Sequence, residues 1–358
     1  MSHPVLAELR RGEIVESFHR GSYAVVDSSG TIVASAGDTE RPVYPRSAIK
    51  SLQALPLVAS GAADRFDLDD AELALACASH GGEPAHVATA SSMLAKAGLD
   101  SKLLECGTHW PLNEDASRAL AARRDTPRTL HNNCSGKHAG FACLGCLLAG
   151  DADAARGFLR GYVEPDHRVM REVGAAIEAA TGVRLANAPR AIDGCSIPTY
   201  GLPLRALAHA FARLGTGHGL APEHARAATR LRAAVAAQPF MVAGSGRLDT
   251  ALMLHFGERL FCKVGAEGVY CAALPERGFG LALKIDDGNN ARAAEVVLVA
   301  LVEALLPLSD LDRAALASRA EVTLRNWNGL VVGRLSATDA ARPAGIASRL
   351  DALDSGLR

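Results

Sequence analysis

The sequence is poor in aromatic residues, in lysines and in long apolar runs. Aromatic side chains make up 4% of the 358 residues, although 49% are hydrophobic. The formal net charge is −1 and the isoelectric point is about 6.9, so nothing favours binding to nucleic acid or to an anionic membrane. The most apolar run, residues 296–302, is far shorter than the ~20 residues that cross a bilayer. We therefore expect a soluble, helix-rich globular protein.

The first four residues lack the basic start and the apolar core of a signal peptide. We therefore expect a cytoplasmic protein whose eight cysteines stay reduced, without disulfides. Cys143 and Cys146 lie within an apolar helical stretch and are expected to be core thiols. Three histidines near polar loops are more often hydrogen-bonded structural residues than catalysts: His109, His131 and His138.

Several common signatures are missing. The pair Gly136-Lys137 is not a Walker loop, because His131 stands where its first glycine belongs and His138 replaces the Ser/Thr. The chain has no Gly-x-Ser-x-Gly elbow and no His-Glu-x-x-His zinc helix. The short Gly278-Phe279-Gly280 segment lacks the rest of the dinucleotide-binding spacing. The sequence therefore carries none of the common motifs that would assign it to a nucleotide-binding, esterase or zinc metalloprotease class.

The order of expected elements indicates an α+β fold. Strand-rich ends, about 4–60 and 255–335, flank a helical middle of about 61–254, and residues 340–358 are expected to form a loose tail. Strands are predicted at 14–19, 23–27, 31–34, 260–264, 269–273, 278–285 and 322–335. Helices are predicted at 69–78, 84–97, 113–124, 137–148, 164–181, 203–214, 222–237 and 291–306. The strands of both ends should build one antiparallel sheet that packs with helices, beside a helical subdomain. Length alone suggests about two domains.

One short stretch carries the first chemical signal. Pro45 suits the first turn of a helix, and Ser47 and Lys50 are three residues apart, so both should lie on one helical face. A serine nucleophile and a lysine base can be built in this way on one rigid element. A chance Ser-x-x-Lys pair on a structural helix is the alternative.

The scarcity of lysine strengthens that signal. The chain has six lysines but 32 arginines, so arginine supplies most of the cations. Only lysine can lose its proton when it is desolvated, which makes a retained lysine a better candidate for a neutral amine. Nucleotide composition offers another explanation of the same bias.

Two further segments fit a serine–lysine site. Ser79 follows an apolar helix and precedes Gly81 and Gly82, whose backbone N–H groups can approach a ligand; an ordinary helix C-cap is the alternative. Lys263-Val264-Gly265 ends a predicted strand and is similar to the Lys-Thr-Gly strand of serine β-lactamases and penicillin-binding proteins. A surface cation at a strand end is the alternative there.

A possible metal site involves Cys134, Lys137 and Cys195. Cys134 and Lys137 flank the start of a helix, where the positive field favours a thiolate, and Cys195 follows Asp193-Gly194. Two thiolates and a neutral amine suit a borderline-soft ion such as zinc. Buried structural cysteines are the alternative.

Taken together, these segments match a known family. The chain resembles the rhizobial-type, class 3 L-asparaginases, the bacterial L-asparaginase II domain family, over about residues 5–327. The matching stretches are Pro45-Arg46-Ser47-Ala48-Ile49-Lys50, Ala78-Ser79-His80-Gly81-Gly82, His131-Asn132-Asn133-Cys134-Ser135-Gly136-Lys137-His138-Ala139-Gly140, Asp193-Gly194-Cys195 and Lys263-Val264-Gly265-Ala266-Glu267-Gly268.

The resemblance implies a fold like that of β-lactamases or glutaminases, one domain over 1–358, a homodimer, and hydrolysis of L-asparagine to L-aspartate and ammonia. Two serine–lysine tandems then fall on Ser47–Lys50 and Ser79–Lys263. Zinc, which aids substrate recognition, falls on Cys134, Lys137 and Cys195, with Asp193 placed to hold a metal-bound water. Substrate binding is assigned to Arg46, His138 and Asp193.

In the mechanism that we expect, neutral Lys50 accepts the Ser47 proton and Ser47 attacks the side-chain amide carbon. Lys263 is the second cation that lowers the proton affinity of Lys50, and Ser79 can relay protons between the two amines. Either serine can be the nucleophile; the helical position favours Ser47. The alternatives are a glutaminase, a penicillin-interactive serine hydrolase, or a zinc-bound amino-acid-binding protein without catalysis.

Overall fold

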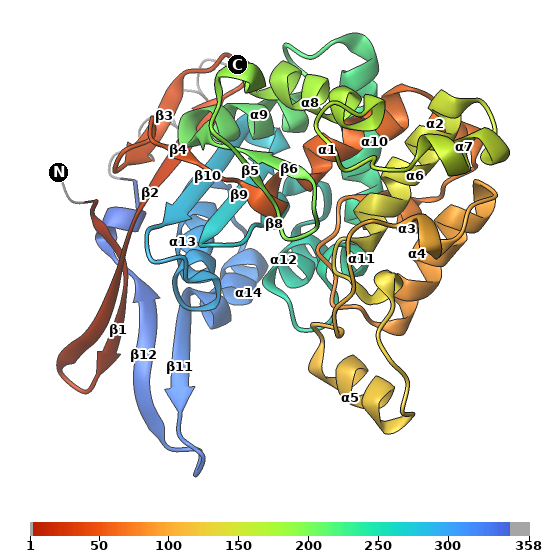
Figure 1. The fold of residues 1–358 in the computed structure, drawn as a ribbon. Helices are drawn as coiled ribbons and strands as arrows, with labels where there is room; N and C mark the ends of the chain where they lie inside the picture. The colour runs from red at the N-terminus through yellow and green to blue at the C-terminus, as the bar shows by residue number, and fades with distance from the viewer. Residues whose placement is uncertain (1–2, 344–358) are drawn as a thin grey trace.

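The computed structural model describes residues 3–343. Its main sheet runs in the order β11-β12-β1-β2-β10-β9-β8, with β3 added beside β2, and every pair is antiparallel. The strands are β1 (Val5–Arg11), β2 (Ile14–Asp27), β3 (Ile32–Ala36), β8 (Phe261–Val264), β9 (Val269–Leu274), β10 (Phe279–Ile285), β11 (Glu321–Arg325) and β12 (Val331–Ala337). The α+β class and the joining of both chain ends in one antiparallel sheet are therefore confirmed (Figure 1).

The long strand β2 connects the two halves of the sheet. Its first part pairs with β1, and its second part, residues 21–27, pairs with β10. Sequence analysis predicted two separate strands here, at 14–19 and 23–27. They are one strand because Gly21 continues the ladder, opposite Ile285, without an intervening turn. A Cβ atom at Gly21 would lie 2.3 Å from the Lys284 carbonyl oxygen, so glycine is required at this close approach.

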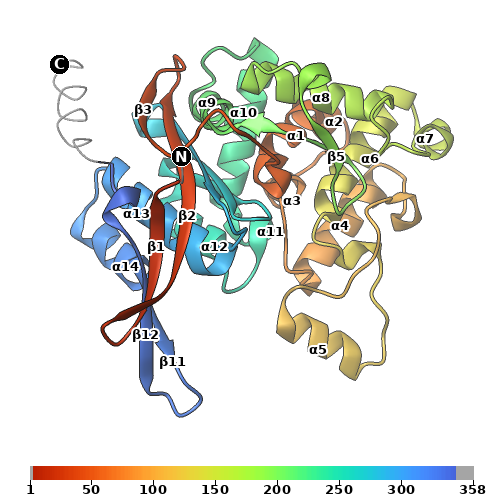
Figure 2. The same cartoon turned by 60° about the vertical axis from the view of Figure 1, so that its left-hand side comes forward.

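Helices cover the sheet and form a second body beside it (Figures 1 and 2). Helix α9 (Leu204–Thr216) packs on β2, β9 and β10, and a Cβ at Gly280 of β10 would lie 1.9 Å from the Ala208 carbonyl oxygen. Helix α13 (Glu295–Leu305) packs on β1 and β12, and α14 (Asp310–Ala320) packs on β11. The remaining helices are α1 (Lys50–Ala59), α2 (Ala62–Arg65), α3 (Asp70–Ala76), α4 (Pro84–Lys96), α5 (Glu114–Ala122), α6 (Ser135–Ala149), α7 (Ala152–Phe158), α8 (Arg168–Thr181), α10 (Pro222–Ala237), α11 (Pro239–Ala243) and α12 (Leu248–Phe256).

Helix α1 lies at the centre of the helical body. It contacts α2, α3, α6, α8 and α10, and every residue from Lys50 to Leu57 is buried. The body also contains two small sheets that sequence analysis missed, β4 (Pro42–Val43) with β7 (Leu202–Pro203) and β5 (Arg190–Ile192) with β6 (Pro198–Tyr200). A buried α1 fixes any functional side chain at its N-terminus against several neighbouring elements.

Several predicted boundaries were wrong for local reasons. The last strand, predicted over 322–335, is a hairpin of β11 and β12, because Asn326 accepts two backbone hydrogen bonds and Gly329 has φ of 78°. Helix α8 starts at Arg168 rather than at 164, because the His167 side chain caps the helix by accepting the Val169 N–H. The helix predicted from 291 begins as a π-helical turn, Asn290–Ala294, before α13. Most of the predicted tail, residues 344–358, lies outside the described residues.

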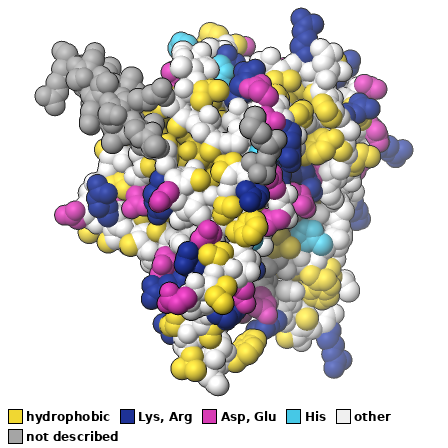
Figure 3. Space-filling view, turned by 90° about the vertical axis from the view of Figure 1, so that its left-hand side faces the viewer, with side chains coloured by type: hydrophobic (Ala, Val, Ile, Leu, Met, Phe, Trp, Pro, Cys, Tyr) yellow, Lys and Arg dark blue, Asp and Glu magenta, His cyan; other side chains and the backbone are white. Residues whose placement is uncertain are grey.

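The surface charges and the lengths of the helices are consistent with the composition of the sequence. On the face in Figure 3, where β1, β2 and β3 lie, basic and acidic side chains are interspersed. Within residues 3–343, no helix has the length and apolar character that spanning a membrane requires.

Candidate active site

The Ser47–Lys50 segment does not form one continuous α-helix. Residues Arg46–Ile49 form a 3₁₀ turn after Pro45, and α1 begins only at Lys50. Arg46 has φ of 51°, which is unusual for a residue with a side chain and marks local strain. Ser47 is half-buried, and the Lys50 side chain is fully buried. The two side chains therefore leave the turn in different surroundings.

The Lys50 amine points to the second serine. Its Nζ donates to Ser79 Oγ at 2.8 Å, to Cys134 Sγ at 3.1 Å, and to the backbone carbonyl of Ala78. Among the hydrogen bonds of residues 3–343, none joins the Ser47 hydroxyl to this amine. The structure thus couples Lys50 to Ser79, whereas the sequence reading paired Lys50 with Ser47 and Ser79 with Lys263.

Ser79 is positioned by the end of α3 and by helix α11. Asp69 caps the start of α3 through a capping box with Glu72. Ser79 lies just after the helix, is 6% exposed, and donates its backbone N–H to the Val242 carbonyl at 2.9 Å. The Gly82 N–H, which was expected to be free to approach a ligand, donates to His80 Nδ1 instead. The glycine serves close packing, since its Cβ would lie 2.9 Å from the His131 carbonyl oxygen.

Lys263 brings a second buried amine from the edge strand β8. Its side chain is fully buried, and its Nζ donates to the Val264 carbonyl at 2.8 Å. Burial lowers the pKa of Lys263 to about 7, against the opposing effect of Asp249, and the charge of Lys50 lowers it further. Burial also lowers the pKa of Lys50, while the nearby Cys134 raises it. Two amines of reduced proton affinity therefore influence each other in one interior region.

The predicted metal ligands come together at the start of α6. Lys137 Nζ donates to Cys195 Sγ at 3.0 Å, and the Cys195 thiol is hydrogen-bonded to the Cys134 sulfur. That bond and the amines of Lys137 and Lys50 hold the pKa of Cys134 well below its ordinary value. The hydrogen bond to Cys134 and burial both raise the pKa of Cys195. Burial lowers the pKa of Lys137, but the sulfurs of Cys134 and Cys195 outweigh burial, so the pKa is raised overall.

The donor set fits zinc with a small adjustment. Sulfur and nitrogen ligands of tetrahedral zinc are about 3.5 Å apart, so Lys137 and Cys195 would separate by roughly 0.5 Å. Lys137 and Cys195 would have to lose protons first. Within residues 3–343, no three His, Cys, Asp or Glu side chains are grouped to hold a metal ion, so a site here depends on the lysine.

Arg46 and Asp193 meet at the partly exposed side of this cluster. Arg46 Nε donates to Asp193 Oδ1 at 2.6 Å, and the two side chains are 28% and 11% exposed. Burial favours a raised pKa for Asp193, but Lys137 and the Arg46 guanidinium outweigh it and lower the pKa. An ion pair of this kind offers one group of each charge to an amino acid.

Of the remaining histidines, His138 and His131 are buried and His109 is half-buried. His138 is fully buried, with Nδ1 at 2.6 Å from the Tyr162 hydroxyl, and no hydrogen bond within residues 3–343 joins it to Arg46 or Asp193. Two other histidines accept backbone N–H bonds, from Asn133 to His109 and from Arg128 to His131. The structural reading of these histidines agrees with these contacts, and the thiols at 143 and 146 are buried on α6 as predicted.

Comparison with known proteins identifies the family. A family model described as L-asparaginase II matches residues 7–337. The chain belongs to the L-asparaginase II family. The resemblance drawn from its sequence motifs is thereby confirmed.

Among solved structures, this L-asparaginase II family chain is similar to the crystal structure of a β-lactamase from Mycobacterium bovis. The two are 16% identical, and the match covers 83% of this chain and 93% of that chain, with a TM-score of 0.33. A score this low carries no argument about either protein. No curated protein matches the chain.

Sequence analysis missed one buried acid near the lysines of this L-asparaginase II family member. Asp249 on α12 is 1% exposed and accepts hydrogen bonds from Val264 N–H and from the Tyr270 hydroxyl. No motif marks it, and the only sequence signal is a single acid at an otherwise apolar helix start.

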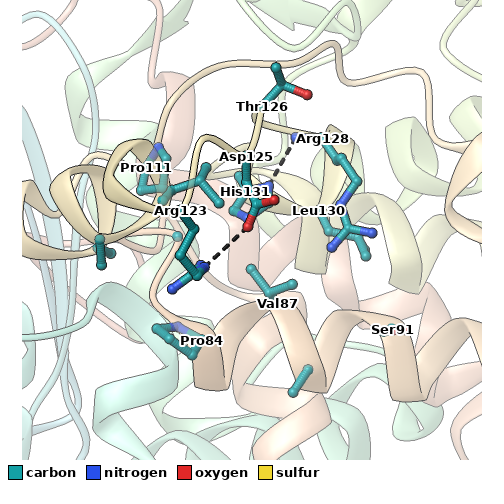
Figure 4. A pocket seen from close by; sticks show the side chains of 15 residues that line it. Pro84, Val87, Ser91, Pro111, Arg123, Asp125, Thr126, Arg128, Leu130 and His131 are labelled. Atoms are coloured by element: carbon teal, nitrogen blue, oxygen red, sulfur yellow. Dashed lines mark hydrogen bonds and ion pairs between the residues drawn. The ribbon is translucent and has the colours of Figure 1, made fainter.

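A cavity lies outside the cluster of serines and lysines (Figure 4). It has a volume of about 650 Å³, and α4, α5 and the 123–131 segment form its walls. Pro84, Val87, Arg123 and His131 are among its lining residues, whereas none of the serines and lysines described above lines it. Arg123 pairs with Asp125 at 3.1 Å on its wall.

Proposed function

We propose that the protein is an amidohydrolase that converts L-asparagine and water to L-aspartate and ammonia. The observation that carries the proposal is the 2.8 Å hydrogen bond between the buried Lys50 amine and Ser79 Oγ. A lysine that can be neutral beside a serine hydroxyl is a base–nucleophile arrangement suited to acyl transfer. Membership of the L-asparaginase II family supports an amide of this class as the substrate.

We assign the attack to Ser47 and the proton relay to Ser79. Ser47 is half-buried and so accessible to a substrate, whereas Ser79 is 6% exposed and already bonded to Lys50. The Ser47 proton passes to Ser79 Oγ as the Ser79 proton passes to Lys50, and Ser47 oxygen bonds to the amide carbon. Collapse breaks the carbon–nitrogen bond, and the Lys50 proton returns through Ser79 to the leaving ammonia. Water then hydrolyses the β-aspartyl ester by the same relay.

Burial explains why this relay can work near neutral pH. An ordinary lysine titrates near ~10.4 and would be charged. Desolvation lowers the pKa of Lys50, so a neutral amine is available as the base. Lys263, with a pKa of about 7, supplies a positive charge next to the base when it is protonated. The two amines therefore titrate as a coupled pair.

Substrate recognition is assigned to the charged pair at the partly exposed side. Arg46 would bind the α-carboxylate and Asp193 the α-ammonium group, each at the cost of weakening their own 2.6 Å contact. His138 would act through its neighbour Lys137, because its side chain is fully buried. An amino acid lacking either α-group should bind poorly.

We further propose that Cys134, Lys137 and Cys195 hold zinc. A bound zinc ion would supply a positive charge for substrate recognition. The donor chemistry, with three protein ligands and an open position, is that of a catalytic-type zinc site.

We also propose that the protein is cytoplasmic and forms a homodimer. Light scattering on a size-exclusion column would test the homodimer.

The test is an assay of ammonia release from L-asparagine and L-glutamine side by side. We expect asparagine to be the better substrate, with one aspartate formed per ammonia. A pocket built for one chain length rejects an extra methylene by ~1–3 kcal/mol, roughly 10- to 200-fold in kcat/KM. Faster glutamine hydrolysis would make the protein a glutaminase, β-lactam turnover would make it a penicillin-interactive hydrolase, and asparagine binding without ammonia release would make it an amino-acid-binding protein.

A further inference from the structure

Asp249 is a buried acid with no counter-ion in direct contact. It is the second residue of α12 and is 1% exposed. Within residues 3–343, it forms no ion pair with a lysine, arginine or histidine. Burying a carboxylate is costly, so it must be compensated by hydrogen bonds or by more distant charges.

Its two oxygens hold the edge of the main sheet. Val264 donates its backbone N–H to Oδ1 at 2.8 Å, and the Tyr270 hydroxyl donates to Oδ2 at 2.7 Å. Strand β8 is the last strand of the sheet, and Val264 lies opposite Tyr270 of β9. An edge strand leaves backbone groups without a strand partner, and Asp249 supplies that partner from a neighbouring helix.

Val264 of β8, whose N–H bonds to Asp249, also binds the Lys263 amine. The Val264 carbonyl accepts from Lys263 Nζ at 2.8 Å, while its N–H is held by Asp249. The position of the amine therefore depends on the backbone that Asp249 fixes.

Asp249 also dominates the negative charge around Lys263. The titratable and charged groups that influence this amine or Asp249 are Asp249 and Arg247 at the start of α12, Lys50 of α1, Cys134 before α6, Cys77 after α3, Cys262 of β8, Tyr270 and Cys271 of β9, and Glu295 of α13. Burial is the largest influence on the pKa of Lys263 and lowers it; Asp249 raises it, and Lys50 and Arg247 lower it. Burial raises the pKa of the Cys77 and Cys271 thiols, so these stay neutral.

We propose that Asp249 is a positioning residue that fixes the strand holding the Lys263 amine and supplies the negative charge that balances this amine. The catalytic consequence rests on the proposed function, in which protonated Lys263 is the cation beside Lys50. Without the carboxylate, Lys263 loses its proton at lower pH and the two amines no longer differ in charge at the working pH.

The test follows the titration of Lys263 directly. Lysines labelled with carbon-13 at Cε give few NMR signals, because the chain has six lysines, and the Lys263 signal is assigned by its loss in Lys263→Met. In Asp249→Asn, an acceptor for the Val264 N–H remains but the charge is gone. We expect the titration midpoint of Lys263 to fall by about one pH unit, and the pH profile of kcat/KM to move to lower pH in the same direction.

Two control variants separate charge from structure. Tyr270→Phe removes a hydrogen bond to Asp249 but keeps the carboxylate, so it should cost stability without lowering the midpoint. Arg247→Gln removes a charge of opposite sign and should raise the midpoint. Asp249→Ser offers a second neutral variant if the asparagine variant does not fold.

The outcomes are distinct. A folded neutral variant whose midpoint equals that of the wild type overturns the proposal, as does an equal downward shift in Tyr270→Phe. If neither neutral variant folds, a midpoint that fails to rise in Arg247→Gln overturns it. A wild-type protein that releases no ammonia would refute the proposed function, but the NMR midpoints would still decide the role of Asp249.

Discussion

Replacing the two site serines by alanine is the sharpest test of the proposed relay. In Ser79→Ala the Lys50 amine loses its 2.8 Å partner but keeps its contacts with the Ala78 carbonyl and with Cys134. One hydrogen bond contributes about 1 kcal/mol to stability, so the variant should stay folded. Loss of a positioned proton-transfer group lowers kcat by ~10²–10⁴.

Ser47→Ala should be more severe, because the acylated oxygen itself is removed. We expect no measurable ammonia release and an unchanged melting temperature. Ser51→Ala, in the first turn of the adjoining helix α1, is the matched control. Its hydroxyl is buried, 1% exposed, and has no hydrogen-bond partner within residues 3–343, so its removal should leave both activity and stability unchanged.

The assay combines coupled ammonia detection with mass spectrometry of protein quenched during turnover. The β-aspartyl ester should appear on the peptide that contains Ser47, and it should be absent from Ser47→Ala. An ester on Ser79 would reverse the two roles. Activity of Ser47→Ala or Ser79→Ala within tenfold of the wild type would refute the serine–lysine mechanism.

Four further predictions concern other parts of the site and the fold. The pKa of Lys263 is about 7 in the folded protein and 10.5 in the unfolded chain, so the unfolded chain binds more protons between these pH values. The free energy of unfolding should therefore rise with pH in this range, by up to ~1.4 kcal/mol per pH unit. Urea titrations should show a smaller rise for Lys263→Met than for the wild type. Arg46→Gly should raise KM for asparagine at least about tenfold, because the guanidinium proposed to bind the α-carboxylate is lost; an unchanged KM would remove Arg46 from the binding site. Cys195→Ser should lower the zinc content measured by mass spectrometry and raise KM more than it lowers kcat, and equal zinc in both proteins would contradict the proposed ligands. Gly280→Ala should reduce the free energy of unfolding by ~3 kcal/mol or more, because its Cβ would lie 1.9 Å from the Ala208 carbonyl oxygen; a stability loss under 1 kcal/mol in urea would contradict that packing.

Much of the fold could be predicted where a short apolar run is bounded by turn residues or where apolar residues recur at helical spacing. The strands β8, β9 and β10 and the helices α3, α4, α6 and α10 lie close to their predicted positions. The β11–β12 hairpin was predicted as one strand because both parts have strand-like sequences and the turn around Asn326 between them was not recognised. The two-residue strands β4 and β7 are too short for any periodic signal.

The members of the candidate site were easier to predict than their contacts. Motifs selected Ser47, Lys50, Ser79 and Lys263, but the three-residue spacing suggested a Ser47–Lys50 pair on one helix. The positive φ of Arg46 and the 3₁₀ turn change the direction of the chain just before α1, so the amine meets the loop after α3 instead. Such a contact depends on tertiary packing, and no local pattern encodes it.

Strand β2 has a consequence for the order in which the protein can assemble. Within residues 3–343, β2 is the strand that joins the ladder with β1 to the ladder with β10. Its residues 21–27 pair with residues 279–285, more than 250 positions later in the chain. Closing such long loops slows folding. Lys263 arrives with β8 in this last stage, and until then the amine of Lys50 is open to water. On the ribosome, the protein should therefore acquire its reactive lysines only after nearly all of the chain has emerged.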